Sequence, residues 1–379
     1  MFTHNRWTLL LAGGLVAAWA QTPPAQSSLK VNFPADSPVS LVSADWGESR
    51  TDARGGALVL DLHTSLLLRN SGQRRIRGVT LLVRAQEVSA GGKASVAVPS
   101  LDVRPAETFP IRVDLRLLRP LLAGSGPLAE VSLDGVLFDD LSFYGPNQLN
   151  CRRSMTVWEL EARRDRRHFK SVLEAKGADG LRREMLDTLG RLDEHSQLDV
   201  QVLRRPRVTA AVAAAERQCQ FAFLNMPESP IEPVSGLARI SGGEARAPRI
   251  EVVNRSNRAV SYFEIGWIVR DRQGQEFLAG SVPASEEGLR LQPGARSEVA
   301  GEATLRFSRQ AGQPFAIDGM TAFVSQVEFT DGAIWIPDRA AFADPKLRSA
   351  LAPSPEEQRL AGIYRKKGLI ALVNELRKF

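Results

Sequence analysis

The chain has 379 residues, 43% of them hydrophobic, and a formal net charge of +6 at neutral pH. Its length fits two or three domains, and its composition predicts packed cores, which excludes a wholly disordered chain. The mild basic excess is compatible with anionic partners and equally with plain solubility, so charge alone predicts no nucleic-acid binding.

The first twenty residues have the pattern of a secretory signal peptide. Arg6 precedes an apolar run over 7–20, and the small residues Ala18 and Ala20 precede Gln21 as at a cleavage site. We therefore predict a signal peptide at 1–20, a flexible lead at 21–30, and export to the periplasm or the extracellular space. The alternative is an uncleaved anchor, although an apolar run of about 14 residues is short for a membrane span.

Several short motifs occur twice in the chain. Segment 32–39 resembles 225–231, segment 136–140 resembles 327–331, and Lys176-Gly177 returns as Lys367-Gly368. The members of the last two pairs are both 191 residues apart. This constant spacing predicts a tandem duplication.

Each copy opens with short segments of strand-like sequence. These segments are rich in branched apolar residues and are separated by Asn, Ser, Gly and Pro, which form turns. Over 111–117 apolar residues alternate with charged ones, the period of a strand with one wet face. We predict a mainly β fold with helical appendages, in which immunoglobulin-like antiparallel β-sandwiches cover 31–150 and 225–340. The likeness is one of architecture, because no family signature accompanies it.

Helical sequence follows each predicted sandwich. We predict a helical inter-repeat segment at 151–224 and a C-terminal helical segment at 341–379. Ser354, Pro355 and Glu357 indicate a helix start, with Ser as N-cap, Pro at the first helical position and Glu completing a capping box. The Lys-Gly pair of each copy is expected to break the helix, so each sandwich is followed by a helical hairpin.

Two cysteines, Cys151 and Cys219, flank the inter-repeat segment. Export favours disulfides, and a bridge across so long a loop would contribute about 4 kcal/mol in the chain-entropy model. A Cys151–Cys219 disulfide is therefore a candidate. The alternative is two free thiols, because sequence does not show whether the sulfur atoms approach each other.

No catalytic, cofactor or metal motif is present. The chain lacks a Gly-x-Ser-x-Gly elbow and a phosphate-binding glycine loop, and the histidines after residue 20 lie far apart. We therefore expect no cofactor and no metal, and we favour a non-catalytic protein over an enzyme. The repeated Asp140 and Asp331 fit calcium ligands or, the reading we prefer, side chains that cap their own turns.

Arginines gather in the inter-repeat region, and guanidinium groups bind phosphates and carboxylates through paired hydrogen bonds. The candidate interaction residues are Arg163, Arg164, Arg166, Arg167, Arg204, Arg205 and Arg207, with the aromatic Trp335 as a further anchor. The alternatives are a solvated helix face, because acidic residues are interleaved with the arginines, and a core position for Trp335.

These patterns predict an exported, non-catalytic binding or scaffolding protein of the cell envelope or extracellular space. The expected partner is an envelope or extracellular protein or an anionic polymer, and no nucleic acid is expected. One alternative is a cell-wall or glycan-directed hydrolase with a site between the repeats. Another is a peripheral membrane protein that uses the C-terminal amphipathic helix, where Leu369, Leu372, Val373 and Leu376 form an apolar stripe.

Overall fold

A computed structural model describes residues 29–86, 91–120, 127–194, 198–203, 216–284, 288–299, 303–309 and 315–379. The predicted signal peptide, all but the end of the predicted lead, and Arg204, Arg205 and Arg207 lie outside these residues. The fold is mainly β, with 49% of the described residues in strands and 24% in helices. Within the described ranges no helix has the length and apolarity needed to cross a bilayer.

The chain divides into two compact units. One consists of the described parts of Met1–Gln73, Thr80–Val96 and Pro105–Asp134, and the other of Arg74–Val79, Ala97–Arg104 and Gly135–Phe379. The helices and the whole second half of the chain belong to the second unit.

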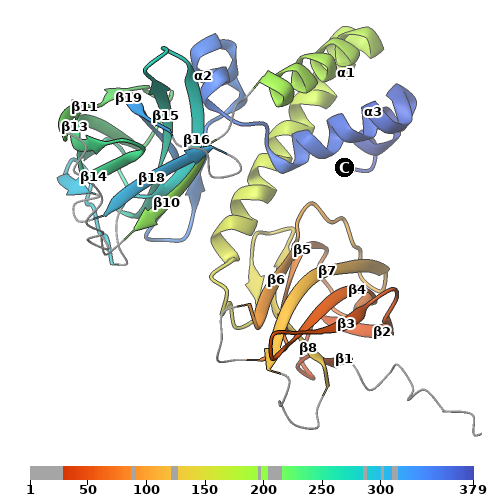
Figure 1. Cartoon of the computed structure of the whole chain (residues 1–379). Helices are drawn as coiled ribbons and strands as arrows, with labels where there is room; N and C mark the ends of the chain where they lie inside the picture. Colours follow the sequence, from red (N-terminus) through yellow and green to blue (C-terminus); the bar gives the residue numbers. More distant parts are fainter. Residues whose placement is uncertain are drawn as a thin grey trace, which may run out of the picture. The chain divides into compact units, whose positions relative to one another are not determined.

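The first half is built from two sheets (Figure 1). In one sheet, β4 (Ala57–Asn70) pairs with β7 (Thr108–Pro120), and also with β2 (Val39–Asp45) and β3 (Arg50–Arg54). The other has the order β1-β8-β5-β6, with β9 also on β8; their bounds are Leu29–Asn32, Ala129–Phe138, Ile76–Arg84, Lys93–Val98 and Phe143–Tyr144. Leu60, Leu62, Leu66 and Leu68 are buried because alternate residues of β4 point to one face of the sheet.

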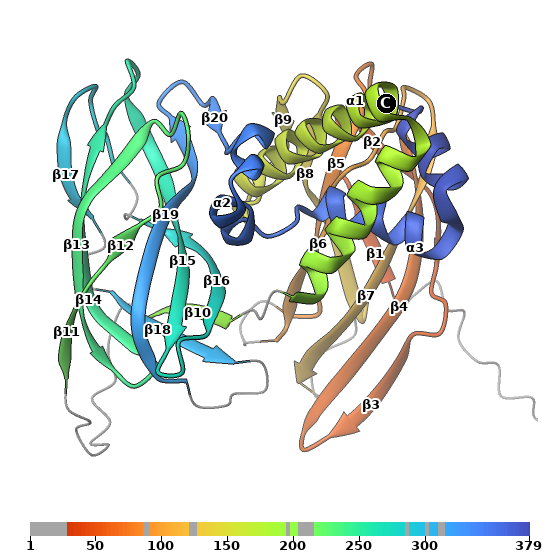
Figure 2. The same ribbon diagram turned by 90° about the horizontal axis from the view of Figure 1, so that it is seen from above.

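The second half also has two sheets, which form separate layers (Figure 2). The first has the order β10-β18-β14-β13-β11, with β17 also on β14; the bounds are Leu198–Leu203, Thr304–Arg309, Glu244–Asn254, Ile231–Ser241, Arg217–Gln220 and Arg296–Val299. The second has the order β12-β19-β15-β16, with β20 also on β19; the bounds are Ala222–Phe223, Ile317–Phe329, Val260–Asp271, Glu276–Pro283 and Ile334–Trp335. A core that includes Phe263, Trp267 and Ile250 is drawn from both sheets.

One sheet has the same strand order in the two halves, β1-β8-β5-β6 and β12-β19-β15-β16. In the other sheet, β13 takes the place of β2 and β3, and β17 and β18 take the place of β7. The first strand of each hairpin carries a bulge at a corresponding place, between Leu41 and Ser43 in β2 and between Pro233 and Ser235 in β13. The hairpins end on equivalent asparagines: Asn70 Oδ1 and Asn254 Oδ1 each accept the amide two residues later at 3.0 Å. The two bulges lie just after the repeated segments 32–39 and 225–231.

Among the described residues of the inter-repeat segment, only the first part is helical. Helix α1 spans Arg152–Glu194, and the chain then adds β10 and β11 to opposite edges of one sheet and β12 to the other. The expectation of a helical segment through residue 224 therefore fails at 198–203, 217–220 and 222–223, which form strands. Strand-like stretches such as 198–203 are short, and their partners lie far away in the sequence, so local patterns do not reveal the pairing.

The C-terminal segment contains η3 (Arg339–Ala343), α2 (Pro345–Ala350) and α3 (Pro355–Leu376). Ser354 caps α3, accepting the Glu357 amide at 3.0 Å with Pro355 at the first position, as the sequence predicts. Helix α3 packs on α1 (Figure 1), and equivalent positions form their shared core: Phe169, Leu181 and Met185 of α1 lie 191 residues before Leu360, Leu372 and Leu376 of α3.

Both long helices break at the glycine of the repeated Lys-Gly pair. Gly177 has φ 66° and ψ −166°, and Gly368 has φ 79° and ψ −178°. This backbone region is essentially restricted to glycine. We expect Gly177→Ala to destabilise the protein by about 1–3 kcal/mol through backbone strain, measured by urea unfolding followed by circular dichroism.

Gly190 is a matched control in the same helix. Nothing lies within 4 Å of a Cβ added there, so Gly190→Ala should be neutral or stabilising by up to about 1 kcal/mol. Equal stability of the Gly177→Ala variant and the unchanged protein would show that the helix does not need this break.

Candidate functional site

Two of the predicted interaction arginines are buried in α1. Arg164 forms paired hydrogen bonds to Asp165 at 2.9 and 3.1 Å and donates to the Pro337 backbone oxygen at 2.9 Å. Arg166 donates to Glu356 of α3 at 2.7 Å. These guanidinium groups bind carboxylates, as their chemistry suggests, but the carboxylates belong to the protein itself.

The other described arginines of the cluster are more accessible. Arg163 donates to Glu159 at 2.8 Å, one helical turn away, and to the backbone oxygen of Asp139. Arg167 is exposed and donates to the Arg163 backbone oxygen at 3.3 Å. The structure therefore separates the cluster, and it does not assemble these side chains into one exposed site.

Two fully buried carboxylates, those of Asp165 and Glu357, lie at the centre of an ionic network between α1, η3 and α3. Arg339 bridges them, with nitrogen–oxygen distances of 3.2 Å to each. Asp165 also accepts from Ser354 at 2.6 Å, and Glu357 accepts from Thr188 at 2.9 Å and from Arg191. Buried charges need this density of partners because desolvation is costly.

The electrostatics of the network favour a structural role. Burial opposes ionisation of Glu356, but hydrogen bonds from Arg359 and Arg166 outweigh it and hold the pKa of that carboxyl below its ordinary value. Burial raises the pKa of Glu161 to about 7, against the opposing effect of Arg164. Because the central carboxylates already accept hydrogen bonds from arginines and hydroxyls, we assign the network to holding the helices together.

Trp335 occupies a core position. It lies in β20 opposite Val327 and packs against two hydrophobic clusters, the sandwich core and the cluster that contains Phe323 and Leu347. It is partly buried, in keeping with the core alternative.

The repeated aspartates cap turns. Asp140 accepts from the Ser142 amide at 3.0 Å, and Asp331 accepts from the Ala333 amide at 3.1 Å and from Arg258 at 2.5 Å. No group of three or more His, Cys, Asp or Glu side chains in the described ranges is arranged to hold a metal ion.

No disulfide joins Cys151 and Cys219 in this structure. Cys219 is buried in β11, and the Cys151 sulfur lies 3.7 Å from Asn147 Oδ1. The candidate disulfide is not formed here.

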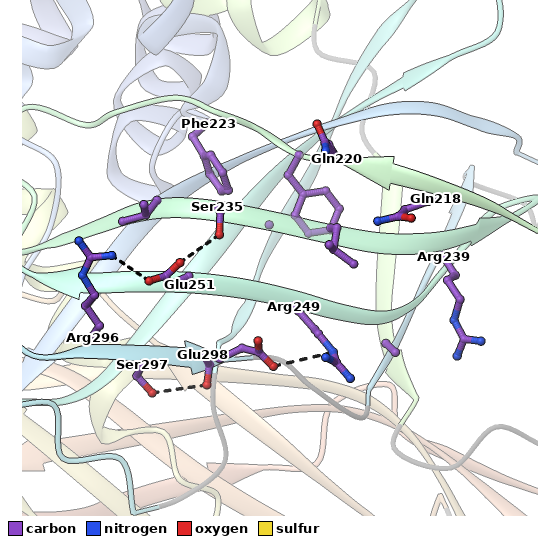
Figure 3. A pocket seen from close by; sticks show the side chains of 15 residues that line it. Gln218, Gln220, Phe223, Ser235, Arg239, Arg249, Glu251, Arg296, Ser297 and Glu298 are labelled. Atoms are coloured by element: carbon purple, nitrogen blue, oxygen red, sulfur yellow. Dashed lines mark hydrogen bonds and ion pairs between the residues drawn. The ribbon is translucent and has the colours of Figure 1, made fainter.

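An open groove of about 950 Å³ lies on the face of the sheet formed by β11, β13, β14 and β17 (Figure 3). Strand β13 has register shifts between Pro233 and Ser235 and between Leu237 and Arg239. Bulges bend a strand and increase its twist, so the two shifts account for the hollow in this face. The lining consists of Gln218, Gln220, Phe221, Phe223, Val234, Ser235, Gly236, Leu237, Arg239, Ala247, Arg249, Glu251, Arg296, Ser297 and Glu298.

Two phenyl rings lie close to the backbone of β13 at Gly236. A Cβ at Gly236 would be 2.7 Å from Phe221 Cδ2 and 3.1 Å from Phe223 Cζ, so the absence of a side chain admits both rings. Phe221 is buried and packs edge to face on Trp267, with ring centroids 5.0 Å apart, while Phe223 is only partly buried. The core thus supports an aromatic floor in the groove.

The charged side chains of the groove are paired across its surface. Arg296 donates to Glu251 at 3.0 Å, and Ser235 donates to the same carboxylate at 3.2 Å (Figure 3). Arg249 lies 3.8 Å from Glu298. These pairs are exposed, so each stabilises the fold by no more than about 1 kcal/mol and remains open to exchange with a ligand.

The sequence patterns did not single out this groove. It depends on β11, whose pairing with β13 is not local, and on two bulges that have no sequence signature of their own. The available signal was the alternation Phe221-Ala222-Phe223 after Gln218 and Gln220, which places both rings on one side of an extended chain.

No protein-family model matches the chain, and no curated protein matches it. Among solved structures, the chain is similar to one named pT26-6p at 8% identity, over 90% of this chain and 74% of that chain, with a TM-score of 0.16. It is similar to a β-glucosidase from Kluyveromyces marxianus at 8% identity (71% and 45% covered, TM-score 0.16) and to red sea bream transglutaminase at 8% identity (76% and 31% covered, TM-score 0.13). We draw no conclusion about fold or function from similarities at these scores.

Proposed function

We propose that the chain is a tandem duplication of one unit, an immunoglobulin-like β-sandwich followed by a helical hairpin. The shared strand order, the bulges in β2 and β13, and the turns at Asn70 and Asn254 support this proposal. The breaks at Gly177 and Gly368 support it as well, because unrelated helices have no reason to share a glycine-only conformation at the same spacing.

On this scaffold we propose non-catalytic binding, with the groove of the second half as the contact surface. The observation that carries the proposal is the groove itself, where an apolar floor lies among exposed side chains that keep hydrogen-bonding capacity. The buried arginines, in contrast, are committed to partners within the protein. The signal-peptide pattern supports export, so the partner would belong to the envelope or the extracellular space.

The apolar stripe of α3 supports docking within the protein over a membrane role. Leu372 and Leu376 are buried against α1, and Leu369 and Val373 are partly buried in the same cluster. A helix whose apolar face is already covered offers a membrane little surface to bury.

The test compares two matched variants of the full chain in binding to the envelope fraction of the native cells. Leu237 in the groove is 36% exposed and Val202 on β10, outside the lining, is 38% exposed. Leu237→Arg should abolish binding of the envelope component to the protein, because it places a charge in the apolar part of the groove lining. Val202→Arg should preserve this binding. Equal retention by both variants would overturn the groove as the contact surface. Turnover of generic glycoside, ester or peptide substrates would overturn the non-catalytic proposal.

A further inference from the structure

We infer that the groove binds a neutral, hydroxyl-rich oligosaccharide, an inference that rests on the proposed binding function and specifies its ligand. Four properties of the groove support this ligand: its charge balance, its hydrogen-bonding groups, its aromatic floor and its size.

The charges of the groove nearly balance, because its lining has three arginines and two glutamates. Arg249 is paired with Glu298 and Arg296 with Glu251, and Arg239 lies 3.8 Å from Glu216 at the edge of the lining. This third carboxylate, that of Glu216, lies outside the lining and also binds Arg246 at 2.7 Å. Each arginine of the lining therefore has a carboxylate within 4 Å. A polyanion would meet a carboxylate within 4 Å of every guanidinium group of the lining, and the excess of one positive charge in the lining attracts it only weakly. This balance favours a neutral ligand over the anionic polymer that the net charge of the chain allows.

The polar groups supply both donors and acceptors. Gln218 and Gln220 lie on β11 and each offers an amide NH2 and a carbonyl oxygen, while Ser235 and Ser297 lie across the groove (Figure 3). A hydroxyl group donates and accepts at once, so it can bind between a carboxylate and a guanidinium group without separating them by much. A ligand that carries a hydroxyl on most ring carbons matches this mixture, and hydrogen bonds to charged partners are the stronger ones.

The aromatic floor and the size of the groove indicate a ring-shaped ligand with several units. One face of a pyranose ring presents C–H bonds, which pack on a phenyl ring such as that of Phe223 and leave the hydroxyls directed toward the rim. The volume of about 950 Å³ lies near the upper end of ligand sites. It therefore fits an oligosaccharide better than a single sugar. The side chains of Val234 and Leu237 extend the apolar surface of the groove along β13.

The test is titration calorimetry of the full chain with neutral glucan, mannan and N-acetylated chitin oligosaccharides. Polygalacturonate, heparin and a mixed peptide library serve as comparison ligands. We expect at least one neutral oligosaccharide to bind with an affinity that changes little between low and high salt, because no counterions are released. Phe223→Ala should weaken binding about tenfold or more, since it removes the stacking surface.

A second variant does not touch the core. Gln218→Ala with Gln220→Ala should weaken the same ligand about tenfold, whereas Gln201→Ala on β10, outside the lining, should leave binding unchanged. Binding that the groove variants do not alter would overturn the inference, as would the absence of binding to any neutral oligosaccharide. Preferred binding of an anionic polymer or a peptide, if lost in the groove variants, would overturn the ligand class and leave the proposed binding function standing. Failure of that function is read separately, from the Leu237→Arg and Val202→Arg comparison.

Discussion

Replacing Glu357 by alanine is expected to destabilise the protein by about 3–5 kcal/mol, because the change removes the buried carboxylate that binds Arg191 and one of the two carboxylates that bind Arg339. The carboxylate is fully buried and binds Arg191, Arg339 and Thr188. Because the site is buried, these partners have little access to water that could replace the carboxylate. Urea unfolding of the full chain, followed by the helical signal in circular dichroism, measures the loss.

Two comparisons separate this effect from a general sensitivity to lost ion pairs. Glu298→Ala removes an exposed pair with Arg249, whose side chains are 60% and 61% exposed, and should cost no more than about 1 kcal/mol. Arg191→Ala combined with Glu357→Ala should cost less than the two single changes together, because the pair acts as a unit. Similar losses for Glu357→Ala and Glu298→Ala would contradict the structural role of the network.

The sequence was sufficient for the regular parts of the fold. Alternating apolar residues in strands such as β4 and the cap at Ser354 are local signals, and they specify a strand and a helix start without reference to distant residues. The turn-forming residues between the strand-like segments include the asparagines that end β4 and β14, and both cap turns in the structure.

The sequence was less informative wherever the partners are distant. Arg166 looked like part of a charged helix face, and yet its carboxylate partner, Glu356, lies 190 residues away. Strands β10 and β11 were not predicted for the same reason. An edge strand depends on the sheet with which it pairs as much as on its own residues. The groove depends on β11 and on bulges beside Gly236, so it follows from tertiary pairing and not from any local motif.

Trp267 links the stability of the second sandwich to the shape of its groove. The side chain is almost fully buried in the core, and Phe221 packs edge to face against it. We expect Trp267→Ala to cost about 3–5 kcal/mol, because it removes the largest buried side chain and leaves a cavity. The cavity lies directly beneath Phe221, so that ring should also lose its fixed position in the floor of the groove.

Trp267→Phe tests whether the shape of the groove depends on the aromatic contact between residue 267 and Phe221. Phenylalanine keeps an aromatic partner for Phe221 and omits the buried indole N–H, which has no hydrogen-bond partner among the described residues. Its cost should therefore be clearly smaller than that of Trp267→Ala. Under conditions where both variants remain folded, ligand binding should be weakened by Trp267→Ala and largely retained by Trp267→Phe. Equal binding by the two would show that the floor does not depend on the core packing beneath it.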